Sequence, residues 1–147
     1  MRPVRPLLDP RAVRTAEFAA DRMAAIHRCA DVLEEIGAVH PAYRQAMLAQ
    51  ERLMSTYLGA GVAVPHGLAG ACALVKRDAL AVLRLPGGVD WAGGQVTVCV
   101  AIAARGEEHI EMLAALVEIL LDPCRARLLR EAADPAAIAK MLCSPRR

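Results

Sequence analysis

Two of the four histidines stand where an imidazole could do chemistry. His66 lies in the run AVPHG, after a β-branched stretch and a proline and before a glycine. Pro65 stiffens the approach and favours an extended conformation at the residue before it. Gly67 permits close approach of another backbone or of a phosphate. The pattern predicts either a rigidly presented, functional imidazole at the end of a strand or a histidine that caps a turn.

His109 lies in the run RGEEHIEML, in the first turn of a helix predicted over residues 106–121. The amino end of a helix carries partial positive charge, which favours a neutral imidazole beside a bound anion. The alternative is a histidine at the edge of the core that bonds to backbone. We interpret the other two histidines, His27 and His40, as surface residues.

Composition excludes several classes of protein. The chain has 147 residues, a formal net charge of +2 and only 3% aromatic residues, which argues against a nucleic-acid binder. Its longest uninterrupted apolar run, Val98–Ala104, is far shorter than the about 20 residues of a membrane span. Arginines interrupt the amino-terminal segment, so no signal peptide is indicated. We expect a cytoplasmic protein that is not inserted in a membrane.

The five cysteines are spread along the chain, odd in number and without a CxxC pair. This spacing predicts neither a zinc knuckle nor a disulfide framework. We interpret the cysteines as small, buried or half-buried thiols in a reducing compartment. His66 and His109 without a third ligand make a poor metal site, so no metal and no cofactor are expected.

Periodicity predicts alternating helices and strands. We expect strands at 12–15, 59–65, 79–85 and 95–103, with the third ended by Pro86-Gly87-Gly88. We expect helices at 21–37, 41–54, 106–121, 123–132 and 135–142, the last two opened by Asp-Pro pairs. The order predicts an α/β fold: a single three-layer α/β/α domain over residues 11–147 with a central mixed sheet, preceded by an arm at 1–10.

An ordered set of motifs carries a family resemblance. Between Tyr43 and Leu113 the chain reads STYLG, then GVAVPHG, then PGGVDW and AIAARGEEHIEML. This series resembles the mannitol/fructose type of enzyme IIA, a domain of the bacterial phosphoenolpyruvate-dependent sugar phosphotransferase system, with the mannitol branch most similar. The similarity extends from about Val13 to Leu142. The α/β/α fold that the family implies agrees with the periodicity.

The resemblance implies a phosphohistidine relay. His66 would accept a phosphoryl group from the carrier HPr and pass it to a cysteine of enzyme IIB, for uptake of a mannitol- or fructose-like sugar. His109 would lie beside it and help hold the phosphate. The chain would be a separate subunit that meets its partners in trans through an apolar surface near His66, with Leu68, Ala69 and Val89–Trp91 as candidates.

One position departs from the family pattern. Where the family commonly has an arginine before the acid that precedes STYLG, this chain has Gln50. Glutamine donates hydrogen bonds to phosphate but carries no charge. Arg52 lies roughly 200° round a helix from Gln50, so it replaces the charge only if the helix has frayed. Two alternatives therefore stay open: a regulatory, nitrogen-type enzyme IIA, or a degenerate module that acts by binding proteins.

Overall fold

The computed structural model describes residues 8–106 and 108–143, without the side chains of Glu108, His109 and Cys143. Its strands are β1 (Val13–Arg14), β2 (Tyr57–Gly59), β3 (Val62–Ala63), β4 (Ala79–Trp91) and β5 (Gly94–Ala103). Its α-helices are α1 (Arg22–Glu35), α2 (Tyr43–Leu53), α3 (Glu108–Leu121), α4 (Pro123–Glu131) and α5 (Pro135–Cys143). Two short 3₁₀ helices, η1 (Pro10–Ala12) and η2 (Ala69–Leu74), complete the elements described.

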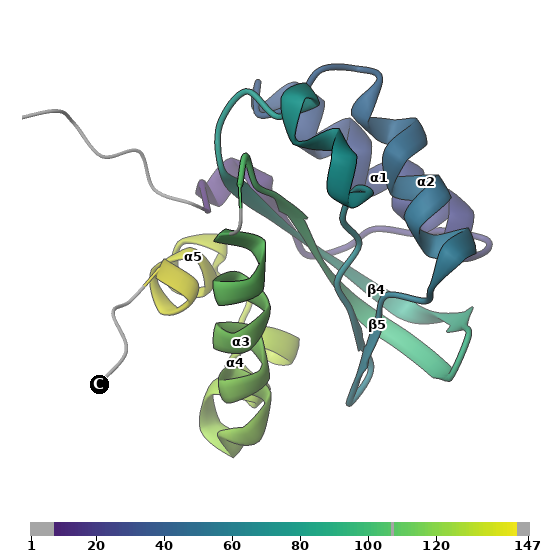
Figure 1. Ribbon diagram of the computed structural model, residues 1–147. Helices are drawn as coiled ribbons and strands as arrows, with labels where there is room; N and C mark the ends of the chain where they lie inside the picture. The colour runs from purple at the N-terminus through teal and green to yellow at the C-terminus, as the bar shows by residue number, and fades with distance from the viewer. Residues whose placement is uncertain (1–7, 107, 144–147) are drawn as a thin grey trace, which may run out of the picture.

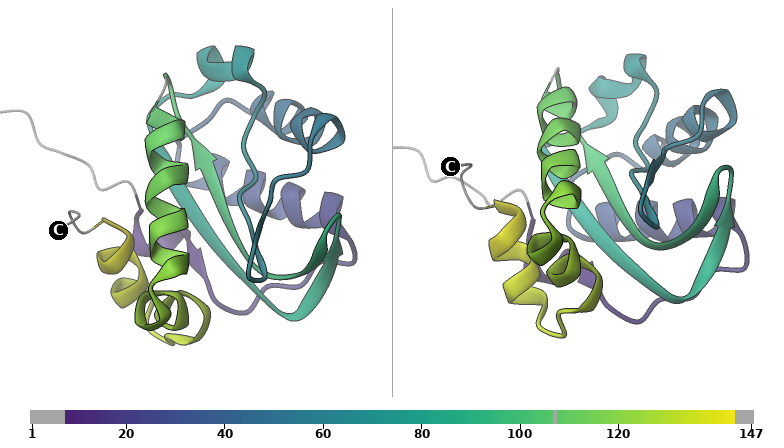
Figure 2. Two further views of the ribbon diagram at one scale, coloured as in Figure 1. Left: turned by 60° about the horizontal axis from the view of Figure 1, so that its bottom comes forward. Right: turned by 90° about the horizontal axis from the view of Figure 1, so that it is seen from below.

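The five strands form one mixed sheet in the order β1-β4-β5-β3-β2. β1 is parallel to β4, and β3 is parallel to β5, whereas the β4–β5 and β2–β3 pairs are antiparallel. Helices α1 and α2 lie on one side of the sheet and α3, α4 and α5 on the other (Figures 1 and 2). The predicted three-layer α/β/α fold with a mixed sheet is therefore confirmed.

Local capping signals placed most helices correctly. Asp21 caps α1 by accepting from the Ala24 amide at 2.8 Å, and Gly37 ends that helix with a φ of 73°. Asp122 and Asp134 open α4 and α5 in the same way as Asp21, each accepting from backbone amides of the first turn. Short polar side chains at these positions satisfy amides that have no partner within the helix.

The amino-terminal prediction falls only partly within the structure. Of the arm expected at 1–10, residues 1–7 lie outside the described part of the chain, and Leu8 is buried. Asp9 caps η1, and β1 lies inside the strand expected at 12–15. No helix in the described ranges has both the length and the apolar character needed to cross a membrane.

Two strand predictions were wrong. The single strand expected at 59–65 is a hairpin, because Gly59, Ala60 and Gly61 all have positive φ and turn the chain back between β2 and β3. β4 does not end at Pro86 but continues to Trp91. The pairing with β5 shifts between Arg84 and Val89, so the missing amide of Pro86 costs no ladder hydrogen bond there.

Burial corrects two further expectations. The helix expected at 41–54 ends at Leu53, and Met54, which helical spacing would place on the face of the buried Met47, is 70% exposed. Cys29 and Cys99 are fully buried, as expected, and a hydrogen bond from the Cys29 thiol to the Cys99 sulfur, together with burial, raises the pKa of the Cys29 thiol. Cys72 of η2 and Cys124 of α4 are exposed, so these two thiols are neither buried nor half-buried.

Candidate functional site

His66 lies at the end of the segment that follows β3. Val64 and Pro65 are buried, and the Ile102 amide of β5 donates to the Pro65 carbonyl at 2.9 Å. His66 itself forms an isolated parallel bridge with Ile102. The sheet therefore fixes the backbone of the histidine at a strand end, as the sequence predicted. His27 and His40 are exposed, which confirms their interpretation as surface residues.

The ring of His66 is partly buried and oriented by its own loop. Its Nδ1 lies 2.9 Å from the carbonyl oxygen of Val64. A carbonyl oxygen only accepts, so Nδ1 carries the proton and donates it. In the neutral ring the lone pair is then on Nε2. The structure thus selects one tautomer and one candidate nucleophilic atom.

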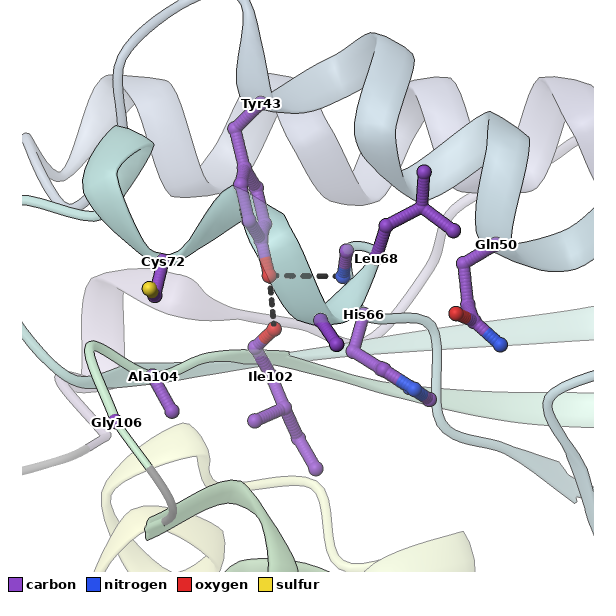
Figure 3. Close-up of a pocket in the computed structure, with 10 residues that line it drawn as sticks. Tyr43, Gln50, His66, Leu68, Cys72, Ile102, Ala104 and Gly106 are labelled. Carbon is purple, nitrogen blue, oxygen red and sulfur yellow. Dashed lines mark hydrogen bonds between the residues drawn. The ribbon is translucent and has the colours of Figure 1, made fainter.

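Gly67, the residue after the histidine, makes room for a side chain and not for the backbone or phosphate that we expected. A Cβ on Gly67 would lie 2.5 Å from Cε1 of Tyr43, so the close approach is that of the tyrosine ring. The Tyr43 hydroxyl accepts from the Gly67 amide at 2.8 Å and donates to the Ile102 carbonyl at 3.2 Å (Figure 3). Burial raises the pKa of Tyr43, which keeps this hydroxyl protonated as a donor.

A cavity of about 220 Å³ opens beside these groups. It brings together His66 and Gln50, two residues that the sequence analysis singled out, and Figure 3 shows both side chains extending to the same side of the loop. The other lining residues are Tyr43, Gly67, Leu68, Ala69, Cys72, Ile102, Ala104 and Gly106. Such a volume exceeds that of several water molecules and accommodates a phosphoryl group.

The residues proposed for the partner surface divide into two groups. Leu68 and Ala69 line the cavity beside His66. Val89 and Trp91 are buried and do not line it. Arg52 is exposed and is not among the lining residues either, since the helix continues to Leu53 and has not frayed. Among the lining residues that the structure describes, none is a lysine or an arginine.

A buried carboxylate next to Gln50 was missed by the sequence analysis. Glu51 is 2% exposed and accepts from the Thr56 amide at 3.1 Å, the Thr56 hydroxyl at 2.6 Å and the Trp91 indole at 3.1 Å. Arg22 lies 3.6 Å from the same carboxylate. The signal was available, because Glu51 follows the buried Met47 by one helical turn and so shares its face.

The second predicted histidine, His109, lies on the third layer of the fold, in helix α3. His109 belongs to the first turn of α3, but its side chain lies outside the described part of the structure. Among the described side chains, no three from His, Cys, Asp and Glu gather as they would around a metal ion.

Comparison with known proteins gives the family. Residues 6–144 match the family model of the phosphoenolpyruvate-dependent sugar phosphotransferase system, EIIA 2. The chain belongs to this family. The expected resemblance is thereby confirmed, and the EIIA chain is a component of a phosphotransferase system.

Solved EIIA structures have the same fold. IIA mannitol from Escherichia coli is 31% identical, with a TM-score of 0.79 over 91% of this chain and 97% of that one. Enzyme IIAMTL from the same organism, in its complex with phosphorylated enzyme IIBMTL, is 29% identical, with a TM-score of 0.83 over 92% of this chain and 98% of that one.

Among curated relatives of this EIIA, the multiphosphoryl transfer protein of Xanthomonas campestris is 41% identical over 140 residues. These cover 95% of this chain but 17% of that protein, so the chain spans less than a fifth of the relative's length. The mannitol-specific phosphotransferase enzyme IIA component of Staphylococcus aureus is 43% identical over 89 residues, which cover 60% of this chain and 62% of that one.

Proposed function

We propose that this EIIA domain carries a phosphoryl group on Nε2 of His66, received from an HPr-type carrier and passed to a cysteine of an enzyme IIB. The observation that carries the proposal is the orientation of the His66 ring, whose Nδ1 contacts the Val64 carbonyl oxygen beside a cavity that Gln50 also lines. The sugar is proposed to be mannitol- or fructose-like, and the reaction cytoplasmic.

The transfer needs positioning more than it needs a base. The Nε2 lone pair attacks phosphorus, the P–N bond of the donor's phosphohistidine breaks, and its electron pair returns to the donor ring. Positive charge then develops on the His66 ring. The Val64 carbonyl, already accepting from Nδ1–H, stabilises that charge without having to move.

Gln50 and His109 are proposed to hold the phosphoryl oxygens. The Gln50 amide donates hydrogen bonds but adds no positive charge, so it stabilises the phosphorylated state less than an arginine would. We propose His109, by its place in the first turn of α3, as a second donor.

The proposal is tested by incubation with phosphoenolpyruvate, enzyme I and HPr. We expect acid-labile, base-stable phosphate on the wild type, none on His66→Ala, and slower but complete labelling of His109→Ala. His27→Ala and His40→Ala are matched controls, since both histidines are exposed and do not line the cavity. Unlabelled wild type, or a fully labelled His66→Ala variant, would contradict the proposal.

The uncharged Gln50 favours a second candidate, a regulatory or degenerate EIIA that acts by binding proteins. In a degenerate module, Gln50→Arg would gain phosphate that the wild type does not hold, and the wild type would bind its partner protein regardless of phosphorylation. In a regulatory EIIA, binding of the partner protein would depend on whether the domain is phosphorylated. If the relay is right, the wild type transfers its phosphate to an enzyme IIB and Gln50→Arg only slows hydrolysis of the phosphohistidine.

A further inference from the structure

Both backbone groups of Ile102 are used to hold the peptides on either side of His66. The Ile102 amide donates to the Pro65 carbonyl at 2.9 Å. The Ile102 carbonyl accepts from the Tyr43 hydroxyl at 3.2 Å, and that hydroxyl accepts from the Gly67 amide at 2.8 Å. Hydrogen bonds thus connect both neighbours of the histidine to one residue of β5, and a single phenol oxygen completes the connection.

We propose that Tyr43 is a positioning residue for His66, which holds the loop so that Nε2 faces the incoming phosphoryl group. The inference rests on the proposed function and concerns the same site. Tyr43 acts through His66, because its hydroxyl is engaged by Gly67 and Ile102.

The hydroxyl is suited to this position because it donates and accepts at once. Tyr43 is 4% exposed, and Gly67 is buried as well, so water cannot easily replace either hydrogen bond. A phenylalanine would fill the same space but would leave the Gly67 amide and the Ile102 carbonyl without this partner. The Tyr43 ring fits against this loop only because Gly67 has no Cβ, which would collide with it.

Without the hydroxyl, we expect the loop to move relative to β5 and the His66 ring to leave the Val64 carbonyl for part of the time. The two neutral tautomers would then exchange, and Nε2 would carry the lone pair for only a fraction of the molecules. Small displacements of a reacting group are costly in transfer reactions, and a shift of about 1 Å can lower a rate about 100-fold.

The experiment compares Tyr43→Phe with Tyr57→Phe, the same chemical change at the second of the two tyrosines, which does not line the cavity. Phosphoryl transfer from phosphorylated HPr is measured by rapid quench, and the His66 tautomer is measured from its imidazole ¹⁵N shifts. We expect Tyr43→Phe to lower the maximal rate about 10- to 100-fold, with the donor KM nearly unchanged and final labelling complete. Its His66 ¹⁵N shifts should be averaged, whereas Tyr57→Phe and wild type should show one tautomer.

A Tyr43→Phe variant with the wild-type rate and the wild-type ¹⁵N shifts would overturn the inference, as would equal effects of both variants. If wild type takes up no phosphate, the proposed function fails, while the ¹⁵N comparison still decides the role of Tyr43. Should Tyr43→Phe not fold, hydrogen exchange of the Gly67 amide in the wild type decides: strong protection supports the inference, and exchange at the rate of an unprotected amide contradicts it.

Discussion

Both helical layers pack on the sheet through buried apolar side chains, such as Ile26 and Leu33 of α1, but they differ in the hydrogen bonds that they add. On the α1–α2 side, Tyr43 and Glu51 reach from α2 to the loops and strands that surround the cavity through hydrogen bonds. On the α3–α5 side, buried Leu116, Leu129 and Ile138 pack by apolar contact. Hydrogen bonds are directional whereas apolar burial is not, so the candidate site is built on the side whose geometry is the more narrowly defined.

The comparison has one exception on the α3–α5 side. Arg84 of β4 is 8% exposed and donates to the carbonyls of Leu128 and Leu129 at 3.0–3.2 Å. These carbonyls belong to the last turn of α4, where the negative end of the helix dipole favours a cation. Burial lowers the pKa of Arg84, so desolvation offsets part of this attraction. Within the described part of the chain, this side thus has a charged contact whose arginine does not line the cavity.

The largest effect is expected for Glu51→Ala. It leaves the Trp91 indole and both Thr56 donors without their buried acceptor, and we expect the free energy of unfolding to fall by about 3–5 kcal/mol. Because Gln50 is the adjacent residue, the transfer rate of the folded fraction should fall as well. Urea denaturation and a transfer assay measure the two effects. Glu111→Ala, at an exposed position of α3, is the control. If Glu51→Ala lowered the free energy of unfolding by less than about 1 kcal/mol, the hydrogen bonds of the α1–α2 side would not distinguish it from the α3–α5 side.

Arg84→Met should have a smaller effect and, unlike Glu51→Ala, one confined to stability. We expect the free energy of unfolding to fall by about 1.5–3 kcal/mol, since hydrogen bonds from a charged donor are lost while the apolar stem is kept. The transfer rate per folded molecule should match that of the wild type. A clear drop in that rate would mean that the two layers are coupled through the sheet.

Asp122→Ala tests a capping contact of the same layer. Its carboxylate accepts from the Cys124 and Arg125 amides at 3.0 and 3.4 Å. We expect a loss of about 1 kcal/mol in the free energy of unfolding, and only a few tenths for Asp122→Asn, which keeps a capping oxygen. Thermal unfolding by calorimetry distinguishes the two variants. Equal losses would show that charge rather than hydrogen bonding matters at this cap.

The smallest effect is expected at the surface pair of Arg127 and Glu131, which lie one turn apart on α4 with side chains 77% and 60% exposed. A double-mutant cycle with Arg127→Ala and Glu131→Ala should give a coupling of less than about 0.5 kcal/mol. The coupling should decrease further in salt. A larger, salt-independent value would show that charged surface contacts also hold this layer.

Local signals explain what the sequence could predict of the fold. The helix starts at Asp21, Asp122 and Asp134 depend on side chains next to the amides they bind, so they can be read from neighbouring residues. The continuation of β4 past Pro86 cannot, because it depends on the shifted pairing with β5. The hairpin at Gly59–Gly61 depends on strand pairing in the same way. Ala60 has a positive φ there, which is rare for alanine and could not be predicted from the residue type.

In the candidate site, too, features set by neighbouring residues could be predicted, whereas features set by distant residues could not. His66 was predicted from its neighbours Pro65 and Gly67, and the family resemblance drew attention to Gln50, which the structure brings to the same cavity. The role of the Tyr43 hydroxyl could not be predicted, since its partners are 24 and 59 positions away. Tyr43 lies four residues before the buried Met47 and so shares its helical face, but the two hydrogen bonds of the hydroxyl depend on the fold.

The side chain and the backbone of Ile102 have different roles, so substitutions at this position meet two separate requirements. Its side chain is buried in the hydrophobic interior, where valine or leucine would pack nearly as well. Its backbone amide donates to the Pro65 carbonyl of the His66 loop, and every amino acid except proline has such an amide hydrogen. Evolution at this position would therefore be expected to tolerate many aliphatic replacements and to reject proline.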